Sequence, residues 1–513
     1  MGWHMTFLPV AQRELLAASR RKATFRMRTG SAIFAALLTF IMLLFVSATG
    51  AGARSGQFLF NTLVAGGHIF AVLAGVFLTA DGISEERRDG TLGFLFLTDL
   101  TGLDIIAGKF TGLVLSAFFG LASVFPVLAI SWFMGGVSNG EFWRNCAAML
   151  NQLFFAACVG LAMSARETRQ ARAVGKTLML VGFFSLLLPV ILSGLHAAGA
   201  HPRVLIPALL SPTAVIDHVG ESAYLRAPSM FFLNLGISHL LGWAFLIYAT
   251  WAVSIRWRLD ADRPQTPAAA TALDRRVMDS SPLGALMGMQ NWPQRVAWFA
   301  SGTTVLVAGV SVSGVADVEV ATIYVPLLLG VLVRGLMAWE VSSFIGECRR
   351  SGSLELILTT PLRDADVTRA VIRHLTARYL APVLLMMVAS LAGTIPNGLF
   401  VTSLIDAVGI VLQIIAIPTV AVWFGLTEPK PMVAFAKTFG FVVVLSTPLN
   451  FVCCVGFAIP PLMSAWAQSK LRLPFRDILA GVRSHWQRRD GWLHSTGPTP
   501  TPTPPPLPYI REE

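Results

Sequence analysis

Charged side chains are scarce in this sequence. Asp, Glu, Lys and Arg make up 13% of the 513 residues, whereas 54% are hydrophobic. A soluble globular chain carries about 25% charged residues, so this composition excludes an ordinary soluble protein. Residues 30–49 and 110–139 contain no charge at all, and each run is long enough for the roughly 20 residues that a helix needs to cross the hydrocarbon core of a bilayer.

Motifs for metal binding and redox chemistry are also missing. The five cysteines form no CxxC pair and no Cys/His ligand pattern. Most of them lie in apolar runs, where cysteine packs as a small apolar side chain. We therefore expect no metal site and no cofactor in this chain; the cysteines are Cys146, Cys158, Cys348, Cys453 and Cys454.

The sequence also lacks a nucleotide-binding P-loop. The nearest approach to GxxxxGK[ST] is Gly175-Lys176-Thr177, but Gln170 occupies the place of the first glycine. His485 and Asp490 have the HxxxxD spacing of some acyltransferases, yet they lie in a charged tail without apolar surroundings. The chain is therefore expected not to be an enzyme.

The apolar runs predict an all-α polytopic membrane protein with about twelve transmembrane helices. The last two runs are short, with only residues 448–450 between them, so a single broken or re-entrant element is the alternative there. The expected spans are 30–50, 59–80, 110–134, 142–164, 174–195, 230–255, 296–312, 320–343, 374–394, 401–424, 432–448 and 451–468.

Positive charges are distributed unequally between the predicted loops. If the N-terminus is cytoplasmic, nearly all Lys and Arg residues fall on the cytoplasmic side, as the positive-inside rule expects. Both termini are therefore predicted to be cytoplasmic. The net charge is +11, but the basic residues do not form a stripe with interleaved aromatics, so they do not indicate a nucleic-acid partner. The exceptions on the outer side are Arg54, Arg144, Arg203 and Arg226.

An internal repeat organises the chain. Residues 85–104 and 347–366 share eight identities in twenty positions, where composition alone would give about one or two. A second pair of cytoplasmic loops repeats the spacing, because Glu167 and Lys176 correspond to Glu428 and Lys437. We therefore predict two tandem six-helix repeats, with a first half at 1–255, a linker at 256–282, a second half at 283–470 and a basic, Pro-rich tail at 471–513.

The first repeated loop has a distinctive composition. A charged cluster is followed by a Gly-Thr/Ser-Leu step and then by an apolar run that is too short to span a membrane. Such a segment suits an amphipathic helix that lies at the cytoplasmic membrane surface. The residues alone leave two roles open, namely an anchor in lipid or a docking site for a cytoplasmic protein.

The pattern ERRxG[TS]LxxLxxTxL of this loop resembles the loop between the second and third helices of ABC-2 type transporter permeases. The resemblance implies a coupling helix that contacts a separate ATP-binding subunit, expected in two copies with ATP and magnesium bound there, in a bacterial inner membrane. The implied docking residues are Glu85, Arg87, Arg88, Gly90, Leu92, Glu347, Arg349, Arg350, Gly352, Leu354 and Glu355, and those of a second cytoplasmic contact are Glu167, Arg169, Glu428 and Lys430.

The two copies of the loop do not match this family equally. Gly93 stands where the second copy has Glu355, and Asp99 stands where it has Pro361. The second copy is therefore expected to dock an ATPase more strongly, and charge reversal at Arg349 and Arg350 is expected to weaken docking more than at Arg87 and Arg88. The stretch 12–28 resembles the amphipathic connecting helix of the same family.

One charge stands out inside a predicted span. Arg334 lies in the eighth span, where an ionisable side chain is a functional candidate. We expect it to reach toward the cytoplasmic interface or to pair with a carboxylate such as Glu340. Two alternatives to an ATP-driven exporter stay open, a secondary transporter and a non-transporting membrane scaffold; the sequence shows no deep set of carboxylates that would favour the former.

Overall fold

All regular elements in the described part of the chain are helical. Nine helical segments there are long and apolar enough to cross a membrane, which confirms an all-α chain of the polytopic membrane type. The computed structural model describes residues 55–88, 90–98, 100–168, 170–197, 201–261, 292–312, 319–350, 352–354, 364–395, 400–428, 431–446, 455–471 and 475, with scattered positions between 12 and 43.

The first half is built around α8, whose apolar window is 83% buried. It packs against α3 at small residues, because a Cβ atom added to Gly75 would come within 2.6 Å of the Ala156 side chain. Small residues of this kind allow membrane helices to approach closely. The helices are α3 (Ser55–Thr79), α4 (Ser84–Arg88), α5 (Thr91–Phe96), α6 (Gly102–Ala122), α7 (Phe125–Phe133), α8 (Asn139–Arg166), α9 (Gln170–Gly182), α10 (Leu188–Ala197), α11 (Glu221–Arg226) and α12 (Pro228–Ala261).

The second half repeats this plan, with α16 and α19 as its most buried helices. The two short spans predicted near its end are broken elements: α20 continues into a five-residue π-helix, η5 (Gly440–Val444), and α22 is preceded by a 3-10 turn. In the first half, α9 continues into a similar π-helix, η1 (Phe183–Leu187). The helices are α15 (Trp292–Val312), α16 (Glu319–Arg350), α18 (Asp364–Thr394), α19 (Phe400–Thr427), α20 (Pro431–Phe439) and α22 (Ile459–Lys470).

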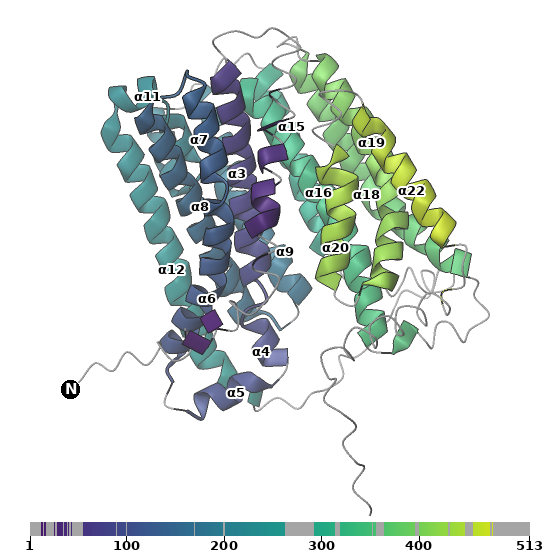
Figure 1. Cartoon of the computed structure of the whole chain (residues 1–513). Helices are drawn as coiled ribbons and strands as arrows, with labels where there is room; N and C mark the ends of the chain where they lie inside the picture. The colour runs from purple at the N-terminus through teal and green to yellow at the C-terminus, as the bar shows by residue number, and fades with distance from the viewer. Residues whose placement is uncertain are drawn as a thin grey trace, which may run out of the picture.

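The two halves stand side by side, with α12 at one edge of the molecule and α22 at the other (Figure 1). The short helices α4 and α5 lie at one end of the first half, and α11 lies at the opposite end (Figure 1). The halves share a core, because Val296 and Leu336 pack into the apolar cluster of the first half. About half of the predicted first span and most of the predicted linker and tail lie outside the described residues.

The segment between α10 and α12 forms an ordered cap at the α11 end. It contains two 3-10 helices, η2 (Pro202–Leu210) and η3 (Ala214–His218), followed by α11. Arg144 of α8 holds the cap, since its Nε donates to the Val219 carbonyl over 2.8 Å and its Nη2 lies 2.6 Å from the Glu221 carboxylate. The guanidinium also stacks over the Tyr224 ring at 4.1 Å from its centroid.

Candidate functional site

The loop between α3 and α6, which the sequence predicts to be cytoplasmic, turns sharply at Gly90. This residue has a φ of 71°, a left-handed conformation that costs a residue with a Cβ roughly 1–2 kcal/mol. The turn redirects the chain from α4 into α5, which runs across the end of the bundle (Figure 1). Leu92 then anchors α5 in the core with only 4% of its surface exposed.

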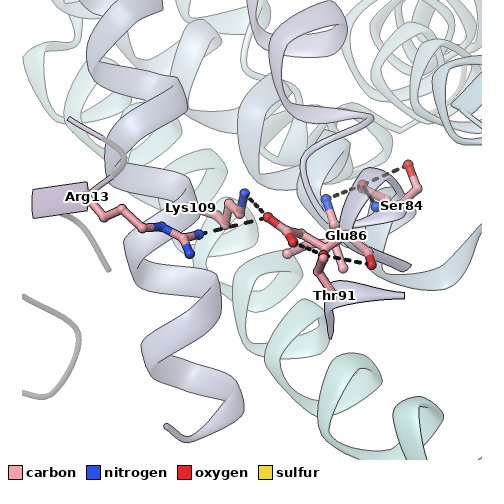
Figure 2. Close-up of polar contacts among 7 residues, drawn as sticks. Arg13, Ser84, Glu86, Thr91 and Lys109 are labelled. Carbon is pink, nitrogen blue, oxygen red and sulfur yellow. Dashed lines mark hydrogen bonds and ion pairs between the residues drawn. The ribbon is translucent and has the colours of Figure 1, made fainter. Parts of the chain in front are cut away.

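Glu86 fixes α4 to the neighbouring helices. Lys109 of α6 donates to its Oε1 over 2.6 Å, and the Arg13 guanidinium lies 4.0 Å from the same oxygen. Thr91 donates a hydrogen bond to the other carboxylate oxygen, so Glu86 joins α6, α5 and the N-terminal segment (Figure 2). The sequence analysis did not single out Glu86, although Lys109, a lone cation in α6, could have pointed to it.

The base of α4 is tied to α8 by a buried serine. Ser164 Oγ accepts hydrogen bonds from the backbone N–H groups of Ile83 and Ser84, at 2.9 and 3.0 Å. This contact holds the α3–α4 turn against the end of α8. The loop is thereby joined to the most buried helix of this half.

The outward face of α5 is apolar. Phe94 and Leu97 are 69% and 78% exposed, and Leu103 at the start of α6 is also exposed. Glu85, one of the predicted docking residues, is exposed on α4. The loop therefore exposes three apolar side chains, Phe94, Leu97 and Leu103, which we call the apolar ridge, and one acidic side chain, Glu85.

The second-half loop repeats this geometry at an offset of 262 residues. Gly352 has a φ of 72°, and Leu354 is buried like Leu92. Ser353 Oγ donates to the Cys348 carbonyl over 3.3 Å, as Thr91 Oγ1 does to the Glu86 carbonyl over 3.2 Å. Glu347 is exposed, Glu355 lies outside the described residues, and the side chains of Arg88 and Arg350 are not described.

Arg349 joins the two cytoplasmic loops of the second half. Its Nη1 donates to the Glu428 carbonyl over 2.7 Å and to the Gly425 carbonyl over 3.3 Å, both at the end of α19. A cation suits the carbonyl end of a helix. Arg349 is thus held within the chain rather than projecting from it, and its counterpart Arg87 is also half-buried.

The second cytoplasmic contact likewise has the same geometry in both halves. Lys176 pairs with Glu167, and Lys437 pairs with Glu428, each across the gap between two helices. The lysines are about half exposed and the glutamates are largely covered. Arg169 and Lys430 lie outside the described residues.

A buried hydrogen bond also recurs, now at an offset of 261 residues. Gln152 of α8 donates to Ser185 in the π-helical segment over 3.2 Å, and Gln413 of α19 donates to Ser446 over 2.6 Å. Both pairs link the central helix of a half to the π-helical element beside it. No local sequence pattern indicated these pairs.

Aromatic rings bridge the two halves. Phe77 of α3 lies 5.9 Å from Trp339 of α16 and 5.5 Å from Phe435 of α20, and Trp339 and Phe435 are 5.6 Å apart (ring centroids). Phe77 and Trp339 occupy equivalent positions, separated by the same 262 residues as the loops. Equivalent residues that touch lie close to the axis relating two repeats.

Arg334 lies deeper than expected. Helix α16 continues to Arg350 rather than ending near 343, so Arg334 sits at mid-helix with 1% of its surface exposed and does not reach the interface. It does not pair with Glu340 either. Its Nε donates to the Gly330 carbonyl over 2.8 Å, and its Nη1 donates to Gln413.

Glu340 instead organises a separate buried cluster between α16 and α18. Arg378 pairs with its carboxylate, His374 Nε2 lies 3.2 Å from Oε1, and Tyr379 donates to Oε2 over 2.7 Å. In the first half, Leu78 stands at the position of Glu340. Within the described residues, no three His, Cys, Asp or Glu side chains gather into a metal site.

Two comparisons with known proteins found no match to this chain. No family model matches the sequence, and no curated protein matches it either. The functional conclusion therefore rests on the geometry above and on the loop pattern.

Proposed function

We propose that this chain is the membrane subunit of an ATP-driven transporter of the ABC-2 type, most simply an exporter, formed by two tandem six-helix permease units. The observation that carries the proposal is the recurrence of the first cytoplasmic loop. Gly90 and Gly352 share a left-handed backbone, and each is followed by a buried leucine, 262 residues apart. Separate ATP-binding subunits would supply the energy, and the chain would lie in a bacterial inner membrane with both termini cytoplasmic.

The contacts of the loops support a mechanical role. Force applied to α4 reaches α6 through Glu86 and Lys109, and reaches α8 through Ser164. In the second half, Arg349 links the corresponding loop to the end of α19. Closure of the ATP-binding subunits would therefore move the central helix of each half.

The proposed pathway runs where the halves meet. Phe77, Trp339 and Phe435 pack against one another there, on helices that correspond to the second and fifth spans of the repeat. Separation of these rings would open the pathway, and their contact closes it.

Docking of an ATPase can be tested on the apolar ridge. Leu97→Asp should weaken co-purification of an ATP-binding subunit co-expressed with the chain, because it places a charge in the proposed contact of the first loop. Leu225→Asp is the matched control, since Leu225 is 69% exposed at the opposite end of the molecule and should leave co-purification unchanged. Equal effects of the two substitutions, or ATP hydrolysis by the purified chain alone, would refute the proposal.

The asymmetry between the loops has its own test. Charge reversal at Arg349 also removes two internal hydrogen bonds. The exposed residues Glu85 and Glu347 are therefore better positions at which to compare docking by the two loops. Glu347→Lys should weaken docking several-fold more than Glu85→Lys if the second loop is the stronger contact. Indistinguishable affinities for the two variants would show that both halves dock alike.

The Glu340 cluster favours a secondary transporter as the second candidate function. It places a carboxylate, an imidazole, a guanidinium and a phenol within one buried group, and buried groups of this kind occur in proton relays. Substrate flux driven by a proton gradient in ATP-free vesicles, lost in Glu340→Gln, would establish this function in place of the first.

A further inference from the structure

The start of the C-terminal tail is anchored in the core of the second half. Phe475 is 1% exposed and belongs to the apolar core cluster of that half. It stands only five positions after Lys470, where α22 ends, and Leu471 packs against the same cluster. The short connection between α22 and Phe475 is therefore held at both of its ends.

Phe475 lies where the second-half loop joins the helices of the bundle. It lines a small apolar pocket together with Cys348 near the end of α16, Leu354 just after the glycine turn, Val367 at the start of α18 and Leu426 at the end of α19. Cys348 and Leu354 come before the rest of the loop in the chain, and Val367 comes after it. The ring therefore packs between the two ends of the loop.

The first half fills the equivalent place with charges. Cys348 and Val371, which both line the pocket, stand 262 residues after Glu86 and Lys109, and those two side chains form an ion pair. An aromatic ring placed against such a pair would bury charge without a partner, which is unfavourable. The second half has apolar side chains at both positions, and these match the ring of Phe475.

The last span of each half reaches its loop in a different way. In the first half α12 packs directly on the start of α6, where a Cβ atom added to Gly102 would lie 3.2 Å from the Thr250 carbonyl oxygen. In the second half α22 ends at Lys470. The residue that packs beside Val367, at the start of α18, is Phe475, which lies beyond the end of α22.

We propose that Phe475 is a positioning residue that ties the second-half loop to the last span, α22. Its ring, seated between α16, α18 and α19, gives α22 the connection to the loop that α12 has through direct helix packing. A displacement of the loop shifts Phe475, and the shift passes through Leu471 to α22. This inference concerns the chain alone and does not depend on an ATP-binding subunit.

Hydrogen exchange of the full-length protein in detergent tests whether the ring holds the loop. Phe475→Ala should quicken exchange at residues 364–371 and 466–470 at least tenfold, because it leaves a cavity between the helices. Residues 91–96 of the first half should be unchanged. Removal of residues 471–513 should reproduce this effect, whereas removal of 478–513, which keeps Phe475, is the matched control and should alter neither segment. Unchanged exchange in Phe475→Ala, or an equal effect of the two truncations, would overturn the proposal.

A lengthened connection separates a mechanical link from simple packing. Six Gly and Ser residues inserted after Leu471 keep every core side chain but slacken the connection, so this variant decides if Phe475→Ala does not fold. Gly352→Ala strains the loop at its positive φ. In the chain of natural length, it should quicken exchange both at 353–354 and at 459–470.

In the lengthened chain, Gly352→Ala should quicken exchange at 353–354 alone. The matched comparison is the lengthened chain that keeps Gly352, in which residues 364–371 should stay as protected as in the natural chain because Phe475 remains seated. An equal response of 459–470 to Gly352→Ala in both chains would overturn the proposal. The absence of any response of α22 in the chain of natural length would overturn it as well.

Discussion

At the residue scale, one group of buried polar contacts in the second half centres on Glu340. Its carboxylate accepts from Arg378 and Tyr379 and lies beside His374. A buried ion pair adds little net stability, but removing one member leaves the other charge uncompensated. The cluster is therefore more sensitive to loss of Glu340 than its modest net contribution suggests.

Glu340→Ala should destabilise the protein by about 3–5 kcal/mol, because Arg378 loses its buried counterion. Unfolding in mixed micelles, followed by circular dichroism, measures the change in the free energy of unfolding. Asp366→Ala is the matched control, since it breaks the exposed pair with Arg369 and should change stability by less than about 1 kcal/mol. Similar losses in the two variants would show that the cluster is not buried in the folded protein.

The pKa of Glu221 determines how the cap at the α11 end responds to pH. Hydrogen bonds from Ser138 and Arg144 hold the pKa of Glu221 below its ordinary value of 4.5. A lowered pKa in the folded state means that the carboxylate stabilises the cap above pH 4.5 and that this contribution is lost as the pH falls further. The protection factors of residues 202–226 in hydrogen exchange should therefore fall as the pH drops below 4.5.

The Glu221→Gln variant is the control for the cap. It keeps the shape of the side chain but does not titrate, so its exchange rates should lack this additional acid step. An identical step in the wild type and the variant would assign the acid response to another group.

At the scale of elements, the two glycine turns define the cytoplasmic loops. Gly90→Ala and Gly352→Ala should each destabilise the local turn by roughly 1–2 kcal/mol, because alanine is strained at their positive φ. Hydrogen exchange of residues 91–96 and of 353–354 measures the effect. Gly93→Ala is the control: it has open space around it and helical backbone, so it should slow exchange instead.

The sequence predicted the elements whose signals are local. Uncharged runs marked the long helices, and the Gly-Thr/Ser-Leu step marked the turn between α4 and α5. The predicted span ends near 343, whereas helix α16 continues seven residues further to Arg350, because charged side chains do not end a helix. That error also placed Arg334 too near the interface.

The sequence alone could not predict contacts between distant segments. Glu86 and Lys109, or Gln152 and Ser185, meet only because helices cross at particular angles, and neither pair has a characteristic spacing. The docking residues themselves stay a prediction, since their partner is another polypeptide.

At the scale of the whole molecule, the aromatic contact between the halves should control leakage. Phe77→Ala combined with Trp339→Ala removes two of the three rings that close this contact, so proteoliposomes with this variant should release a small entrapped dye without ATP. Trp466→Ala is the control, because it removes a ring of similar packing against Trp423 at the far side of the second half. If the folded double variant retains the dye, the pathway lies elsewhere in the molecule.

The meeting of Phe77 with Trp339, two different residues at equivalent positions, has an evolutionary consequence. In a dimer of identical chains every substitution appears twice, so a buried arginine or glutamate would be imposed on both sides of the axis. A single chain that contains both halves is free of that constraint. Within the described residues, Arg334 and the Glu340 cluster occur only in the second half, and Val72 and Leu78 stand at the equivalent positions of the first half.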